Sequence, residues 1–368
     1  MKLNKQTREY LKQKVVGYVS KDQKSHEVAK YLRLDLGENL LGCSPKVTAT
    51  IKNLEPDDLC FYADPSASII KNTIANLYGI HSENILVGNN SNEIIDFLPK
   101  MIIERDDHCL IIDPTFFRFK ESSLAAGGKI ISLKPRPGDK FKPNSQLIDS
   151  IISESKKAVV KLIWICNPNN PTGEVYNPDQ IIEVVKKSGS FVVIDEAFYE
   201  YYDPENKHSA INLISKYKNL LVLRTLSKAY GLAGIRFGYA IGSKEVIKII
   251  ENYRNTLLMT SSVVQKIAKV ALEDQAYLKK TVMQTRALRI DLFACISKIK
   301  NIELGGLSKT NIYLLKHKYK NLYEELLKRN ILTSNFNEVD GIKNRGYVKV
   351  TVAKEKENKK LIKILGGL

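Results

Sequence analysis

One lysine stands in a run of hydroxyl and glycine residues, RTLSKAYGLAGIRFGYAIG, at residues 224–242. Thr225 and Ser227 precede Lys228, and Arg236 follows it with a guanidinium that can grip a phosphate through paired hydrogen bonds. A lysine amine beside anion-binding groups and an apolar run can lose its proton near neutral pH and form a Schiff base with a carbonyl compound. The ordinary alternative is a surface lysine in a basic loop.

Two further polar side chains follow buried apolar runs. Asp195 ends the run FVVID, and a buried carboxylate is costly unless it has a partner, for which a cationic ring nitrogen is suitable. Asn170 lies in NPNNPTG, a rigid turn that would hold its amide toward a crevice. A helix-capping aspartate and a plain turn are the ordinary alternatives.

Two more turns offer groups that suit a flat, phosphorylated ligand. Phe116 or Phe117 follows CLIID and can stack on a flat ring, although core packing explains either residue equally simply. Asn90 and Ser91 follow ILVG at the start of a predicted helix, where free N–H groups bind anions. An ordinary N-cap is the alternative there.

The elements that must position these residues are seven short apolar runs separated mostly by helix-length segments. Runs rich in β-branched residues indicate strands that are buried on both faces, and their alternation with helices predicts an α/β fold with a mostly parallel seven-stranded sheet. The helix that starts at NPDQIIEVVKK has Asn177 as its cap and Gln180 in a capping box. The predicted strands are 85–88, 109–113, 129–133, 159–166, 191–195, 220–225 and 237–242.

The carboxyl ends of such strands meet at one edge, which is where ligands bind in α/β sheets. The turns described above would therefore supply a phosphate site, a stacking ring, an acid, an amide and a reactive amine in one crevice. Together these are the requirements of pyridoxal 5′-phosphate, whose ring nitrogen Asp195 would keep protonated while Lys228 holds the aldehyde.

The chain divides into three parts in this interpretation. Residues 1–34 form a polar N-terminal arm, 35–255 a large domain, and 256–368 a smaller α+β domain. The pattern predicts a long helical stretch over about 243–300, strands at 311–316 and 347–352, a helix from 321 and a terminal helix.

Composition excludes several classes of protein. The net charge is +17, but the lysines are spread along the chain without aromatic interleaving, which favours a solvated surface and anionic small molecules over nucleic acid. We find no apolar run of membrane-spanning length and no secretory signal, so a cytoplasmic protein is expected. Five scattered cysteines without C-x-x-C spacing favour buried free thiols over disulfides or a metal site.

Taken together, these motifs resemble the fold-type-I, class I and II aminotransferases that depend on pyridoxal phosphate. NPNNPTG, DEAFYEY and RTLSKAYGLAGIRFGYAIG occur in the family's order and spacing, and FYADPS and LDLGENLLGCSP resemble elements of its histidinol-phosphate aminotransferase branch. The similarity spans nearly the whole chain.

The resemblance implies a role for each matching residue. Lys228 is the Schiff-base lysine, Asp195 pairs with the pyridine nitrogen, and Asn170 bonds the phenolic oxygen. Tyr62 would reach the phosphate of a neighbouring subunit, so a homodimer is expected. The implied phosphate ligands are Asn90, Ser91, Thr225, Ser227 and Arg236, with Phe116 stacked on the ring and Asn39 and Asn311 facing substrate.

Three positions depart from the family pattern. Phe198 stands where these aminotransferases usually have Tyr, and a Phe there also occurs in related phospho-threonine decarboxylases. Thr333 and Lys349 stand at positions that usually carry Arg, and Lys is a point charge without the bidentate fork. Arg345, in the preceding loop, is a possible replacement for the second arginine.

The main hypothesis is therefore an aminotransferase that moves an amino group, expected from L-glutamate, to a small phosphorylated carbonyl compound. Histidinol phosphate and a triose-phosphate-like ketone such as dihydroxyacetone phosphate are both candidate partners. A decarboxylase of phosphoserine or phosphothreonine is the alternative that Phe198 favours. A non-enzymatic regulator with the same fold is disfavoured by the intact Lys228, Asp195 and Arg236.

Overall fold

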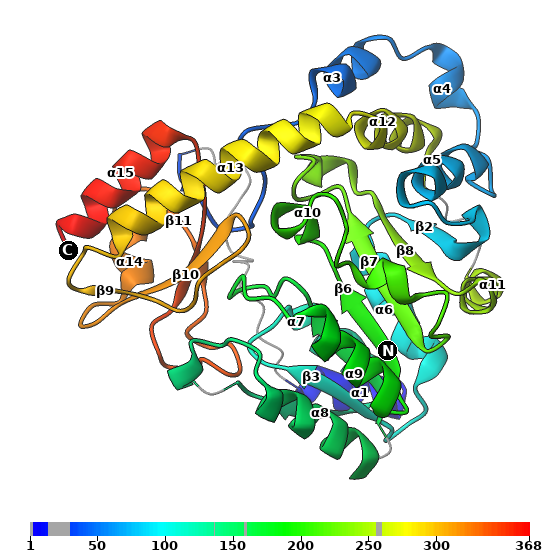
Figure 1. Cartoon of the computed structure of the whole chain (residues 1–368), viewed down its shortest axis with the longest axis horizontal. Helices are drawn as coiled ribbons and strands as arrows, with labels where there is room; N and C mark the ends of the chain where they lie inside the picture. Colours follow the sequence, from blue (N-terminus) through cyan, green and yellow to red (C-terminus); the bar gives the residue numbers. More distant parts are fainter. Residues whose placement is uncertain (1–2, 14–29, 136, 158–159, 255–259) are drawn as a thin grey trace.

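The computed structural model describes residues 3–13, 30–135, 137–157, 160–254 and 260–368. A large unit is built on a seven-stranded sheet, and a smaller unit carries the C-terminal strands (Figure 1). A part of the predicted N-terminal arm, residues 14–29, lies outside the described residues, and α1 (Lys5–Lys12) precedes it.

The large sheet has the order β2-β8-β7-β6-β5-β3-β4. All neighbouring strands are parallel except β8, which runs antiparallel to both β2 and β7. The prediction of a mostly parallel seven-stranded sheet is confirmed. The strands are β2 (Ile85–Gly88), β3 (His108–Ile112), β4 (Lys129–Leu133), β5 (Val160–Cys166), β6 (Phe191–Asp195), β7 (Leu220–Thr225) and β8 (Gly238–Gly242).

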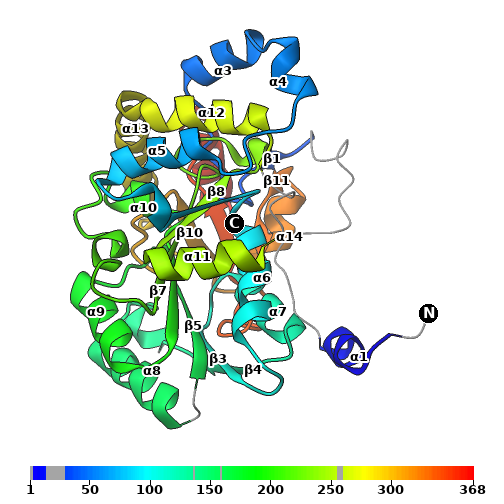
Figure 2. The ribbon, with the colours of Figure 1, turned by 90° about the vertical axis from the view of Figure 1, so that its right-hand side faces the viewer.

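Helices cover both faces of this sheet (Figures 1 and 2). Alternate side chains of β5 show the two cores: Ile163 and Ile165 belong to one buried cluster, and Leu162 and Trp164 to the other. The first cluster contains apolar residues of α5 (Ser68–Tyr78), α8 (Ser145–Lys157), α9 (Pro178–Lys187) and α12 (Ser262–Glu273); the second contains those of α6 (Ser91–Ile102), α7 (Phe117–Ala125) and α11 (Lys244–Tyr253). Asn177 and Gln180 form the predicted capping box of α9.

The predicted helical stretch over about 243–300 is largely helical in the described residues, but it consists of three helices, α11, α12 and α13 (Gln275–Ile296). Arg254 has extended backbone angles after α11, and Asp274, with ψ of 60°, separates α12 from α13. The apolar periodicity continues across both positions, so it does not reveal where the axis changes direction.

The smaller unit contains a four-stranded antiparallel sheet of order β12-β13-β10-β9. The strands are β9 (Ile302–Leu304), β10 (Ile312–His317), β12 (Ser334–Asn335) and β13 (Val348–Thr351), flanked by α14 (Leu322–Leu327) and α15 (Glu355–Gly366). The short strand β1 (Leu32–Arg33) pairs with β11 (Ile331–Leu332), which places this N-terminal segment beside the C-terminal unit. The domain boundaries at residues 34 and 255 stay predictions.

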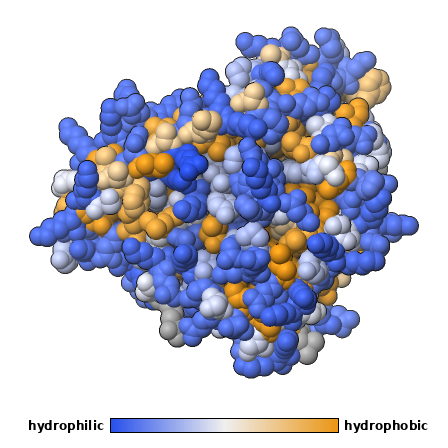
Figure 3. Space-filling view, viewed as in Figure 1, coloured by the Kyte–Doolittle hydropathy of each residue, from blue (hydrophilic) through white to orange (hydrophobic). Residues whose placement is uncertain are grey.

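The surface and the cysteines complete the description. The face in Figure 3 is mostly hydrophilic, with apolar residues between the polar ones. Within the described ranges, every helix is too short or too polar to cross a membrane. Cys109 and Cys166 are buried as expected, whereas Cys60 and Cys295 are exposed, so the prediction of buried thiols is wrong for these two.

Candidate active site

A cavity of about 320 Å³ opens at the carboxyl ends of the sheet strands. This volume lies within the usual range of small-molecule sites, about 300–1,000 Å³. The strand order brings together turns that are far apart in sequence, as the sheet topology predicts. The predicted residues that line the cavity are Asn90, Ser91, Phe116, Asn170, Asp195, Thr225, Ser227, Lys228 and Arg236.

Lys228 lies in the connection between β7 and β8, directly inside the cavity. Its Nζ donates a hydrogen bond to the carbonyl oxygen of Leu36 at 2.7 Å and lies 4.9 Å from the ring centroid of Phe198. Burial lowers the pKa of this amine to about 8, against the opposing effect of the nearby Glu38 and Asp195 carboxylates. About one-tenth of this amine is therefore unprotonated at pH 7, far more than for an ordinary lysine, which favours its action as a nucleophile.

Asp195 is the last residue of β6 and is buried. One carboxylate oxygen accepts a hydrogen bond from the backbone N–H of Ala197 at 3.0 Å. Burial raises the pKa of this carboxyl to about 6, while the Ala197 bond and the charge of Lys228 act in the opposite direction. A cationic ligand atom placed here would favour the ionised form and relieve the cost of burial.

A cluster of hydrogen-bond donors forms the opposite end of the cavity. Asn90 caps α6 with φ of 103°, and Ser91 begins the helix, whose N-terminal N–H groups favour an anion. The hydroxyl oxygens of Thr225 and Ser227 are 2.9 Å apart, and the Thr225 hydroxyl donates to the carbonyl oxygen of Phe237.

Gly238 allows these donors to come together. A Cβ at this position would lie 2.4 Å from the backbone nitrogen of Ser91, so the close approach of β8 to the start of α6 requires a glycine. Arg236, two residues earlier, has a left-handed backbone with φ of 58° and donates to the carbonyl oxygen of Ala233. The connection from β7 to β8 thus supplies hydroxyls at its start and a guanidinium near its end.

Asn170 and Lys349 meet at another wall of the site, although they are far apart in the sequence. Lys349 lies on β13, is 1% exposed, and places its Nζ 3.5 Å from the side-chain oxygen of Asn170. Burial, together with the positive charge of Lys228, lowers the pKa of Lys349 to about 7. The side-chain oxygen of Asn170 therefore faces the Lys349 amine.

Phe116 is held at the cavity by aromatic packing. Its ring meets those of Phe117 and Phe119 edge-on, with centroids 5.3 and 5.6 Å away, and Phe119 stacks on Trp164 at 4.8 Å. This packing continues from the cavity wall into the hydrophobic core.

Five predicted residues lie outside the cavity lining: Lys349, which reaches the site through Asn170, and Asn39, Asn311, Tyr62 and Arg345. The Asn39 side chain donates to the carbonyl oxygen of Ala229 at 2.8 Å, so it supports the Lys228 segment from behind. Asn311 donates to the carbonyl oxygens of residues 37 and 38, and its buried Oδ1 has no hydrogen-bond partner among the described residues. Tyr62 and Arg345 are exposed in the single chain.

Sequence reasoning did not select several residues of the cavity wall. Glu38 is the most notable, because its carboxylate interacts with the Lys228 amine and pairs with Arg33 at 3.2 Å. Glu38 lies within LDLGENLLGCSP, a segment that resembles an element of the family. Cys166 ends a predicted strand and pairs with Asp195 in the sheet. Their nearness to predicted site residues and motifs is the sequence signal that could have identified both residues. The other lining residues are Leu36, Asn92, Ala197, Phe198, Ala233 and Gly234.

The residues present fit pyridoxal phosphate. The donor cluster around Ser91 and Arg236 suits a phosphate dianion, Asp195 suits a protonated ring nitrogen, and Lys228 offers an amine in the same cavity. The structurally described part of the chain contains no cluster of His, Cys, Asp or Glu that could hold a metal ion.

Comparison with known proteins agrees with this geometry. Residues 29–365 match the family model "Aminotransferase class I and II". The chain is 33% identical over 344 residues to the histidinol-phosphate aminotransferase of Thermoanaerobacter pseudethanolicus, covering 93% of this chain and 94% of the relative.

Two solved structures give the same picture of the fold. The histidinol-phosphate aminotransferase of Clostridium acetobutylicum has a TM-score of 0.81 and 25% identity, covering 91% of this chain and 98% of that one. The L-threonine-O-3-phosphate decarboxylase of Porphyromonas gingivalis has a TM-score of 0.78 over the same shares of the chains, and its 20% identity shows a common fold alone.

Proposed function

The chain belongs to the class I and II aminotransferase family, and we propose that it transfers the amino group of L-glutamate to a small phosphorylated carbonyl compound. It is a pyridoxal-phosphate-dependent enzyme resembling histidinol-phosphate aminotransferases. The observation that carries the proposal is the meeting of Lys228, Asp195 and the donor cluster in one cavity, with the Lys349 ammonium nearby as a cation for a carboxylate.

Each residue has a proposed task toward the bound cofactor, which supplies an electron sink for the carbanion at the substrate Cα. Asp195 holds the proton on the ring nitrogen, because its buried carboxylate is most stable beside a cation. Asn170 donates its side-chain N–H to the phenolic oxygen. Lys228, whose pKa is about 8, would take up the proton of the substrate Cα at its Nζ and hold it for return during the transfer.

The donor cluster has the proposed task of anchoring the phosphate. Asn90 and Ser91 offer the start of α6, Thr225 and Ser227 offer hydroxyls, and Arg236 offers its guanidinium. Phe116 would cover one face of the ring. Together these residues would hold the ring in a fixed place relative to Lys228.

Lys349 is the proposed partner of the donor's carboxylate. Its ammonium is buried beside Asn170, whereas the exposed Arg345 is a poorer candidate in the single chain. Asn39 and Asn311 contribute by holding the segment of residues 37–38 and the lysine connection at the substrate side of the cavity.

A homodimer is part of the proposal. Tyr62 is fully exposed, and its neighbours Leu59, Phe61 and Ile69 are large apolar residues that are also exposed in the single chain. A second copy covering this surface would bury them and bring Tyr62 to the partner's phosphate site. A cytoplasmic location completes the proposal.

Absorbance spectroscopy of the purified holoenzyme tests the transferase proposal. Addition of L-glutamate should convert the visible band of the bound cofactor to the band of its amino form, and Lys228→Ala should abolish this conversion. Candidate acceptors, an imidazole-bearing phosphorylated ketone and dihydroxyacetone phosphate, should then restore the original band to different extents. An enzyme that leaves the band unchanged with every amino donor would contradict the proposal.

A decarboxylase remains the second candidate because Phe198 occupies a position where the resembled aminotransferases usually have tyrosine. Its ring lies 4.9 Å from the Lys228 amine and carries no hydroxyl for a phenolic oxygen. Release of carbon dioxide from phosphoserine or phosphothreonine, without conversion to the amino form, would favour this reaction.

A further inference from the structure

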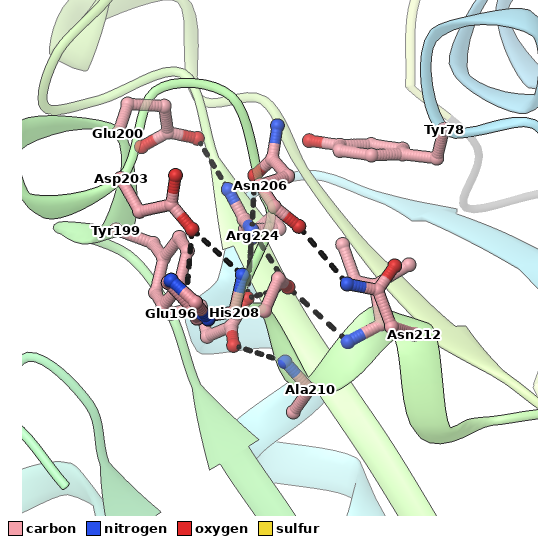
Figure 4. A network of polar contacts seen from close by, with 12 residues as sticks. Tyr78, Glu196, Tyr199, Glu200, Asp203, Asn206, His208, Ala210, Asn212 and Arg224 are labelled. Carbon is pink, nitrogen blue, oxygen red and sulfur yellow. Dashed lines mark hydrogen bonds and ion pairs between the residues drawn. The ribbon is translucent and has the colours of Figure 1, made fainter. Parts of the chain in front are cut away.

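A buried ion cluster lies at the ends of β6 and β7, next to the residues of the active site (Figure 4). Arg224 is fully buried at its centre, and Glu196 and Glu200 are almost as inaccessible. Since buried charges are costly unless their partners are well placed, such a cluster specifies one geometry much more strongly than an exposed ion pair does.

The Arg224 guanidinium is fixed by two carboxylates and two aromatic rings. Its Nε and Nη2 lie 2.9 and 2.7 Å from one carboxylate oxygen of Glu196, and its Nη1 donates to Glu200 at 2.9 Å. Its Cζ lies 4.6 Å from the ring centroid of Tyr199 and 5.6 Å from that of Tyr78, so both rings restrict the movement of the group.

Glu196 is equally constrained. Its carboxylate also accepts from the hydroxyl of Ser209 at 2.6 Å and from the backbone N–H of Ala210 at 2.9 Å. Its backbone N–H donates to the carbonyl oxygen of Leu223, which continues the β6–β7 ladder one residue beyond the strand end.

The alternation of side chains along a strand connects this cluster with the cavity. Asp195 and Thr225 line the cavity, whereas the adjacent Glu196 and Arg224 turn away from it. The Glu196–Arg224 pair therefore connects the ends of β6 and β7 on the side that faces away from the cavity. The same two strand ends carry Asp195 and the Lys228 connection on the side that faces the cavity.

We infer that Arg224 is a positioning residue, which through Glu196 sets the placement of Asp195 relative to Lys228. Glu200 is a secondary partner, because its Oε2 has no hydrogen-bond partner among the described residues. The inference rests on the proposed roles of Asp195 and Lys228. A displacement of about 1 Å between reacting groups can reduce turnover by up to about a hundredfold, so a clamp outside the cavity can control the rate.

The test compares the holoenzyme with Arg224→Lys, Glu196→Gln and Glu200→Gln. Leu221→Ala is the matched control, because Leu221 is fully buried on the same strand but lies away from its carboxyl end. Each protein is characterised by its thermal unfolding midpoint, its cofactor dissociation constant, the pH midpoint of its visible absorbance, and kcat and KM for the glutamate half-reaction.

Arg224→Lys and Glu196→Gln should lower kcat at least about tenfold with KM nearly unchanged. They should also shift the absorbance midpoint by about half a pH unit or more, with a smaller effect in Glu200→Gln. Leu221→Ala should lower the unfolding midpoint without either change. The inference is overturned if Arg224→Lys has a lower unfolding midpoint but unchanged kcat and absorbance midpoint. It is also overturned if Leu221→Ala produces the same changes in kcat and in the absorbance midpoint.

Two additional sets of variants complete the experiment. If Arg224→Lys does not fold, the double variant Arg224→Gln, Glu196→Gln removes both charges together and should show the same loss of kcat; normal kcat in that variant overturns the inference. Lys228→Ala and Asp195→Asn are measured in parallel. If Lys228→Ala and Asp195→Asn have normal spectra and rates, the proposed roles of Lys228 and Asp195 are refuted. If these two variants are impaired but the Arg224 variants have normal spectra and rates, only the positioning inference is refuted.

Discussion

Replacement of Lys349 by arginine should remove a pH dependence from the binding of the donor carboxylate. Burial, with the neighbouring Lys228 charge, lowers the pKa of Lys349 to about 7, whereas an arginine guanidinium keeps its proton throughout the working range. The amine attracts a carboxylate while it is protonated. Carboxylate affinity in the native enzyme should therefore be strongest below pH 7 and decline as the pH rises through this value.

The size of the decline follows from the fraction of charged amine. With a pKa of about 7, Lys349 is about nine-tenths protonated at pH 6 and about one-tenth protonated at pH 8. Affinity should fall about tenfold over this interval, which corresponds to about 1.4 kcal/mol. The bound carboxylate raises the pKa of the lysine, so the complex keeps the proton that the free enzyme has lost.

Glutarate is a suitable ligand because it has two carboxylates and no amino group that would titrate or react. Its dissociation constant can be measured from the change in visible absorbance of the bound cofactor at pH 6, 7 and 8. Lys228 and the cofactor titrate in both proteins, so the ratio of the native constant to that of Lys349→Arg isolates residue 349. The ratio should rise about tenfold from pH 6 to pH 8.

Two outcomes would refute this reasoning. A ratio that stays constant from pH 6 to pH 8 would show that Lys349 does not gain a proton when the carboxylate binds. A Lys349→Met variant that binds glutarate as tightly as the native enzyme at pH 6 would show that another group holds the carboxylate. The exposed Arg345 would then be the next residue to replace.

Two stability predictions accompany this one. Burial raises the pKa of Asp195 from 3.8 to about 6 in the folded chain, so its ionisation costs stability progressively above pH 3.8 and the full penalty is present above pH 6. Asp195→Asn should stabilise the cofactor-free protein at pH 7.5 by up to about 3 kcal/mol in urea unfolding, while weakening cofactor binding; an unchanged or lower stability would contradict this. Gly231 has φ of 71°, and a Cβ there would lie 2.2 Å from the carbonyl oxygen of Gly42, so Gly231→Ala should cost at least about 1–3 kcal/mol. Gly234→Ala, whose Cβ would meet nothing within 4 Å, is the matched control and should be nearly neutral in the same unfolding assay.

The sequence predicts the strands of the large sheet well, because most of them are buried on both faces and are therefore largely apolar, although the edge strand β4 is only partly buried. The helix breaks at Arg254 and Asp274 are missed, since side-chain periodicity continues where the backbone direction changes. Cys60 and Cys295 are exposed because burial depends on which face of an element meets the core, which a residue type alone does not determine.

The same distinction applies to the active site. Residues at strand ends, such as Asp195 and Lys228, can be predicted from the edge where they converge. The pairing of Lys349 with Asn170 could not be predicted, because it depends on how the smaller unit rests on the large sheet. Arg224 and Glu196 are each adjacent in sequence to a predicted site residue. Their ion pair could not be predicted, because it depends on how the ends of β6 and β7 lie side by side on the face away from the cavity.

The antiparallel pairing of β2 with β8 has a consequence for the order of folding. Gly88 pairs with Gly238, so a loop of about 150 residues must close before this ladder can form, which makes it an entropically late contact. On a growing chain, Asn90 and Ser91 leave the ribosome long before Thr225 and Arg236. The phosphate anchor is thus split between an early and a late segment, and the cofactor can stabilise the fold after the last strand of the sheet has been synthesised.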